Sequence, residues 1–154
     1  AMRKLPTGIT GFVSEIAQKK DAVSFEEFTA DMSVLARGME ATIERCNPIL
    51  TCENYFSCEM NWEHRKISIL CNTVYPILAC CEGFVSEERS NHFLFVEPFE
   101  NTVSALHRYQ VYPVEFLNAA IESVIIDQLS HMELSQINHW RPQTVHEVVF
   151  NFWD

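Results

Sequence analysis

The sequence predicts an α+β fold in which an antiparallel four-stranded meander packs against N-terminal and C-terminal helices. Three observations predict it. Apolar residues recur at steps of three and four between Phe25 and Cys46, alternation of apolar and polar residues begins at Phe56, and helical spacing returns after Pro98. Because helices and strands are segregated along the chain, we expect a twisted sheet covered by helices on one face.

The first long helix has a clear start. Ser24 and Glu27 have the spacing of a capping box, in which each side chain bonds the other residue's backbone N–H. The apolar stripe then predicts a helix from Phe25 to Cys46, and Asn47-Pro48 is expected to end it.

Four strands are predicted to follow. Residues 56–62 alternate apolar and polar side chains, and 67–71 continue the alternation after a turn at 64–66. Residues 74–81 form a more uniformly apolar run whose Pro76 indicates a bulge or an edge, and 92–96 are expected to form the fourth strand. Short links between consecutive strands are typical of a meander.

Helical patterns occupy the rest of the chain. A short helix is predicted between Phe99 and Tyr109, and Pro113 is expected to open a longer one that reaches Leu129. Residues 132–140 are irregular or form a short helix, and 145–153 carry the apolar stripe of an amphipathic helix.

Length and composition bound the organisation. The 154 residues, 47% hydrophobic and 21% charged, predict one domain spanning 1–154. We expect 1–11 to be a flexible arm that begins with a tag remnant, Ala1-Met2, and a short helix to end near Lys19-Lys20. With no export signal and no apolar run of the ~20 residues that a membrane span needs, we expect a cytoplasmic protein without a membrane partner.

The charge is strongly acidic. The net charge of −10 repels phosphate backbones, so direct nucleic-acid binding is disfavoured. A negative surface favours encounter with a basic protein partner, and nucleases are often basic. The same charge is also typical of cytosolic proteins that are acidic for solubility alone.

Motifs for catalysis, metals and cofactors are missing from the sequence. Four glycines form neither a dinucleotide-binding nor a phosphate-binding loop, and His146-Glu147 begins a zinc motif that fails because position 150 is Phe. The six cysteines lack a C-x-x-C pair, so we expect free cytosolic thiols. These observations predict a protein that is not an enzyme and that holds no metal or cofactor.

The final residues are unusually apolar and carry a resemblance. Their pattern reads Trp-x-Pro-x-Thr-Val-x-Glu-Val-Val-Phe-Asn-x-Trp-Asp, at Trp140, Pro142, Thr144, Val145, Glu147, Val148, Val149, Phe150, Asn151, Trp153 and Asp154. It resembles the end of a family of small bacterial immunity proteins, which protect a cell from the toxins of contact-dependent growth inhibition and related polymorphic toxin systems. The family pattern has Gly where this chain has His146. The resemblance covers about a tenth of the chain, and it implies a stoichiometric inhibitor without naming the toxin.

A candidate partner-binding surface lies on the first predicted strand. Glu53, Tyr55, Glu59, Asn61 and Glu63 share one parity and would line one exposed face, opposite Phe56, Cys58, Met60 and Trp62. Asp154 is added as a rim residue of the tail. Three carboxylates and a tyrosine on an exposed face suit the masking of a basic active site, although an ordinary solvated face has the same composition.

Three hypotheses for function remain open. The first is an immunity protein that binds and neutralises a cognate toxin, a nuclease by our expectation, by occluding its active site. The second is an adaptor or phage-type interaction protein with another partner. The third is a small enzyme whose site is assembled only in space. Oligomeric state is not indicated by the sequence.

Overall fold

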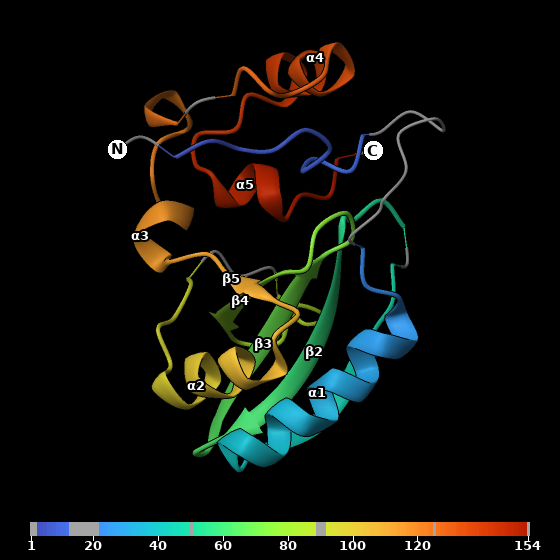
Figure 1. Cartoon of the computed structure of the whole chain (residues 1–154), viewed down its shortest axis with the longest axis vertical. Helices are drawn as coiled ribbons and strands as arrows, with labels where there is room; N and C mark the ends of the chain where they lie inside the picture. Colours follow the sequence, from blue (N-terminus) through green and yellow to red (C-terminus); the bar gives the residue numbers. More distant parts are fainter. Residues whose placement is uncertain (1–2, 13–21, 50, 89–91, 125, 154) are drawn as a thin grey trace.

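The computed structural model describes residues 3–12, 22–49, 51–88, 92–124 and 126–153. The fold is α+β, with a mixed five-stranded sheet in the order β1-β2-β3-β4-β5 rather than the four strands expected. Helices α1 (Phe25–Met39) and α2 (Glu97–Leu106) cover one face of the sheet. The N-terminal segment and the C-terminal helices lie together beyond one end of the strands (Figure 1).

Two hydrophobic cores form because both faces of the sheet are buried. On β4 (Ile77–Glu82), Leu78 and Cys80 pack with the α1 and α2 side chains, whereas Ile77, Ala79 and Cys81 pack with the C-terminal segments. Alternate residues of a strand point to opposite faces, so an almost uniformly apolar strand is suited to this position between two layers. Helices α1 and α2 thus lie on one face as expected, but the opposite face is also buried, by the C-terminal segments.

Helix α1 begins as predicted but ends early. Ser24 and Glu27 form the full capping box. The helix stops at Met39 because Glu40 adopts a left-handed conformation with φ of 57°, and its N–H bonds the carbonyls of the last turn. The expected continuation to Cys46 was wrong: Thr42–Asn47 is strand β1, paired antiparallel with β2. Its β-branched Thr42 and Ile43 suit a strand better than a helix.

The two strands predicted from alternation are confirmed. Strands β2 (Tyr55–Trp62) and β3 (Arg65–Asn72) pair along their whole length. They are joined at Glu63 and His64, whose φ angles of 48° and 62° match the tight hairpin turn that suits the twist of antiparallel strands. Residues 92–96 are not a strand. Phe93 makes a single bridge to Cys81, and the same edge of β4 also takes the short parallel strand β5 (Gln110–Val111).

The C-terminal third is less helical than predicted. The long helix expected after Pro113 is only α3 (Val114–Leu117) and a 3-10 turn at Ile121–Ser123. Helix α4 (His131–Trp140) has its own capping box from Ser130 and Glu133, but α5 (His146–Val149) is a single turn. The reason is tertiary pairing: the N–H of Ile121 bonds the carbonyl of Gln143, and the N–H of Val145 bonds the carbonyl of Ala119. These backbone groups are therefore not available to a longer helix.

Residues 3–12 are part of the core and not the flexible arm that we expected. Leu5 and Ile9 are fully buried in the C-terminal core. The buried carboxylate of Glu133 accepts hydrogen bonds from the N–H groups of Gly8 (2.8 Å) and Thr10 (3.2 Å) and from the Thr10 hydroxyl (2.7 Å). Backbone donors thus stabilise the carboxylate and fix the segment on α4. The expected helix near Lys19-Lys20 lies outside the described residues.

Three buried asparagines tie the remote segments together. Asn72 donates to the carbonyls of Ile9 (2.9 Å) and Val149 (2.8 Å). Asn54 accepts from the N–H of Asn151 (2.7 Å), and Asn151 donates to the carbonyl of Thr10 (2.9 Å). Amide side chains both donate and accept, which lets them satisfy irregular backbone that has no sheet or helix partner. Within the described part of the chain, no helix is long and apolar enough to cross a membrane.

Candidate functional site

The C-terminal tail forms the floor and rim of a groove of about 600 Å³. The tail follows α4 and makes the single turn of α5, and residues of the sheet and of the loop after β4 complete the groove with it. The groove is lined by Tyr55, Leu70, Val85, Phe93, Trp140, Arg141, Pro142, Gln143, His146, Glu147, Phe150, Asn151, Phe152 and Trp153. Its volume lies in the range of about 300–1,000 Å³ that is usual for ligand sites.

Stacked aromatic rings form the wall of this groove. The indoles of Trp140 and Trp153 lie 3° from parallel with centroids 6.4 Å apart. Phe150 contacts Tyr55 edge-to-face and stacks on Phe93, in each case at 6.1 Å. Trp153 is 8% exposed and belongs to the core, whereas Trp140 is 37% exposed. The groove therefore presents aromatic surface whose positions are fixed by the core behind it.

Phe152 adds a second exposed apolar side chain at the groove. It is 47% exposed, although the residues on either side, Asn151 and Trp153, are buried. Phe152 therefore projects from a stretch whose neighbouring side chains are buried.

The groove also holds polar and charged side chains, His146, Glu147 and Arg141 among them. Partial burial lowers the pKa of His146 below its ordinary value, with a small opposing effect of Glu147. Glu147 already accepts hydrogen bonds from the backbone N–H groups of Gln143 and Thr144, which closes the turn before α5. Arg141 ends α4 in a left-handed conformation with φ of 51° and is exposed. Within the described residues, no group of three His, Cys, Asp or Glu side chains is arranged to hold a metal ion.

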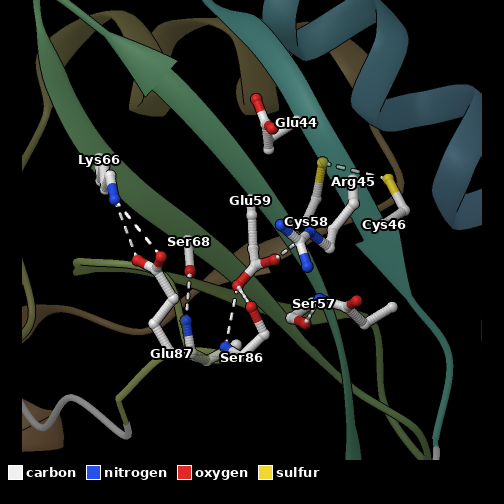
Figure 2. Close-up of polar contacts among 12 residues, drawn as sticks. Glu44, Arg45, Cys46, Ser57, Cys58, Glu59, Lys66, Ser68, Ser86 and Glu87 are labelled. Atoms are coloured by element: carbon white, nitrogen blue, oxygen red, sulfur yellow. Dashed lines mark hydrogen bonds and ion pairs between the residues drawn. The ribbon is translucent and has the colours of Figure 1, made fainter.

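Glu59, the centre of the predicted acidic face, is fully buried. Its Oε1 lies 2.9 Å from the Nε of Arg45, and its Oε2 accepts from the N–H (2.9 Å) and hydroxyl (2.6 Å) of Ser86 (Figure 2). Among the described residues, Oε1 has no aligned hydrogen-bond donor, so Arg45 holds it as an ion pair. The exposed position expected for Glu59 was wrong.

The loop after β4 is what buries Glu59. The loop folds back over the polar side of the sheet and is fixed at three points. Ser68 donates to the carbonyl of Gly83 and accepts from the N–H of Val85. Ser86 bonds Glu59, and Lys66 pairs with Glu87 at 3.1 Å (Figure 2). The polar side chains Glu59 and Ser68 of β2 and β3 therefore contact this loop and not solvent.

A bulge in β1 brings Arg45 to Glu59. The register passes from Ile43 opposite Met60 to Arg45 opposite Glu59, with Glu44 as the extra residue. Without the bulge, Glu44 would stand opposite Glu59, and like charges directly opposite one another are destabilising. The irregularity thus replaces a repulsive pair with an ion pair.

The other predicted site residues are separated. Tyr55 borders the groove, and Glu53 accepts from the N–H and hydroxyl of Thr51 at 3.0 Å each. Asn61 and Glu63 are exposed at the hairpin, at the far end of β2 from Tyr55. Asp154 lies outside the described residues. The sequence pattern of the tail pointed to Trp140 and Trp153, but nothing in it indicated that they share a groove with Tyr55.

Comparisons with known proteins found no matching family model, no matching curated protein and no matching solved structure.

Proposed function

We propose that this chain is a small bacterial immunity protein that binds a cognate protein toxin and neutralises it stoichiometrically by occluding its active site. One observation carries the proposal. The tail segment that resembles the end of such proteins supplies most of the groove lining, and it does so with residue types that dominate protein–protein binding energy: Trp140, Trp153 and Arg141, joined by Tyr55. We place the toxin contact at this groove.

The contact surface proposed here differs from the acidic strand face. Glu59 cannot reach a partner without the loss of its bonds to Arg45 and Ser86. Tyr55 is retained because it borders the groove, and Phe152 is added because it is exposed there. Asn61 and Glu63 remain exposed at the hairpin, where the carboxylate of Glu63 contributes to the negative field.

Charge supports a basic partner. A chain with net charge −10 attracts a positive protein over a distance set by the ionic strength, about 8 Å in physiological salt. A nuclease toxin has the basic surface that this field would steer, and neutralisation would take place in the cytoplasm. We therefore expect association to slow as salt rises.

Co-expression tests the proposal. The toxin domain encoded by the neighbouring gene should arrest growth when it is expressed alone, and this chain should restore growth and co-purify with it. Phe152→Ala should weaken binding, because it removes an exposed aromatic side chain from the groove. The matched control is Phe95→Ala, which changes a phenylalanine that is 73% exposed and does not line the groove.

Three outcomes decide. Rescue that is weakened by Phe152→Ala and not by Phe95→Ala supports both the inhibitor function and the groove. Rescue that is unaffected by either variant rejects the groove as the contact site but still supports the inhibitor function. No complex and no rescue with the neighbouring toxin rejects the immunity function.

A further inference from the structure

Two cysteines face each other across the edge of the sheet. Cys46 on β1 stands directly opposite Cys58 on β2, and their sulfur atoms are 3.1 Å apart (Figure 2). Directly opposed residues of antiparallel strands have Cα atoms about 4.5–5.5 Å apart, which lies within the range of about 4.4–6.8 Å found for disulfides. A bond of about 2.05 Å therefore requires a small movement of the two side chains and no rearrangement of the strands.

The bulge that serves Glu59 also creates this pair. Because Glu44 is the extra residue, Arg45 turns to the Glu59 side and Cys46 turns to the opposite side, where Cys58 lies. A regular ladder would place Arg45 opposite Cys58 and Cys46 opposite Ser57. The same local irregularity thus sets an ion pair on one face of the sheet and a thiol pair on the other.

The two thiols differ in pKa and in accessibility, as stepwise disulfide formation requires of its first and second nucleophiles. The two thiols are hydrogen-bonded to each other, and this hydrogen bond, with a smaller contribution from Thr29, lowers the pKa of Cys46. The same hydrogen bond and burial raise the pKa of Cys58. Cys46 is half-buried and Cys58 is buried. Thiolate, the reactive form, is therefore favoured at the more accessible of the two sulfur atoms.

The other thiols lack this arrangement. Burial raises the pKa of Cys71 and of Cys81 to about 12. Cys80 is also buried, and as Cys81's neighbour on β4 it points to the opposite face. Cys52 donates to the carbonyl of Phe152 at 3.0 Å.

We propose that Cys46 and Cys58 are a redox-active pair that forms a reversible cross-strand disulfide with a small-molecule disulfide such as oxidised glutathione. The Cys46 thiolate attacks one sulfur of the oxidant, the oxidant S–S bond breaks, and one glutathione thiolate leaves and takes up a proton. Cys58 then gives its proton to solvent and attacks the Cys46 sulfur of the mixed disulfide, which releases the second glutathione thiol. Two protein thiols are oxidised by two electrons, and one oxidant disulfide is reduced to two thiols.

The disulfide would tie the edge strand to the rest of the sheet. Among the described segments, β1 pairs in the sheet with β2 only, so it is an edge strand that can separate locally from the sheet. A covalent link at Cys46 and Cys58 blocks that separation. Amide exchange in β1 should therefore be slower in the oxidised protein than in the reduced one.

Equilibration of the full chain in glutathione buffers of increasing oxidised fraction tests the proposal. Free thiols are then alkylated in denaturant, and intact mass and peptide mapping are recorded. We expect a species two hydrogens lighter than the reduced chain, with a 46–58 cross-link that disappears on reduction. Cys58→Ser should instead accumulate one glutathione at Cys46, whereas Cys80→Ser should still form the disulfide.

The mapping decides between the outcomes. A cross-link between any other pair, or glutathione retained at Cys46 in the unmodified sequence, would overturn the proposal. A full complement of six alkylated thiols at every buffer composition would overturn it as well. Growth rescue plays no part in this measurement, so its result is independent of the immunity function.

Discussion

Replacement of Glu59 by Gln is the sharpest test of how the sheet is buried. The substitution keeps the size of the side chain but removes the charge that faces Arg45 at 2.9 Å. It also forces an amide N–H₂ group into one of two positions that now hold acceptor oxygens, one of them bonded to both donors of Ser86. Breaking a fully buried ion pair costs about 3–5 kcal/mol. Arg45 is 51% exposed, so water screens the pair and rehydrates the guanidinium. We therefore expect a loss of about 1–3 kcal/mol of folding free energy.

Urea denaturation followed by tryptophan fluorescence gives the measurement. The control is Glu26→Gln, which makes the same chemical change at an exposed position of α1 and should alter stability by no more than about 0.5 kcal/mol. Arg45→Ala extends the test, because it leaves the Glu59 carboxylate buried without its cation. The double variant should lose less than the sum of the single losses, since both remove the same pair. Equal small effects of Glu59→Gln and Glu26→Gln would refute the burial of Glu59.

Three further predictions concern the tail and its supports. Trp153→Ala should lower stability by about 3–5 kcal/mol, because it deletes a buried indole stacked on Trp140; an unchanged melting temperature would contradict a tail packed in the core. Asn72→Ala should cost about 1–3 kcal/mol, measured by denaturation, because the N–H groups of Val74 and Tyr75 lose their acceptor. The carbonyls of Ile9 and Val149 lose one donor each and keep the other, from Asn54. Partial burial lowers the pKa of His146, so the unfolded chain binds a proton there more readily, and the stability associated with this residue should fall as pH drops below its ordinary value of 6.5. An NMR titration midpoint for His146 at or above 6.5 would contradict this.

Sequence patterns predicted those helices and strands correctly that depend on residues close together in the chain. The capping box at Ser24, the alternation of β2 and β3, and the helix that begins near Pro98 were all readable from the sequence, because each depends on spacing within a few residues. The apolar tail was also readable as a segment packed on something. The same patterns did not predict where elements end. The apolar stripe of α1 continues without a break into Thr42–Asn47, which is strand β1, because over a few residues the spacing of apolar side chains can be the same in a helix and in a strand.

The candidate site depended on contacts between segments far apart in sequence. Glu59 was predicted to be exposed because apolar and polar side chains alternate along its strand. This alternation shows that one face of the strand is polar, but it does not show whether solvent or another segment covers that face. Only the return of the loop at Ser86 and the bulge at Arg45 buried it. Tyr55 and Trp140 are brought to one groove by the packing of the tail against the end of the sheet.

The sequence by itself determined that the chain is acidic, that helices flank a block of strands, and that its final residues must be buried at least in part, because these properties belong to composition and to periodicity along the chain. The tertiary structure decided which polar residues are internal, where the tail stops being helical, and which aromatics form a common surface. Those outcomes depend on backbone hydrogen bonds between segments such as 119–121 and 143–145, and on side chains such as Asn72 that satisfy remote carbonyls. Bonds of this kind leave no local period in the sequence, because their partners are set by the three-dimensional path of the chain.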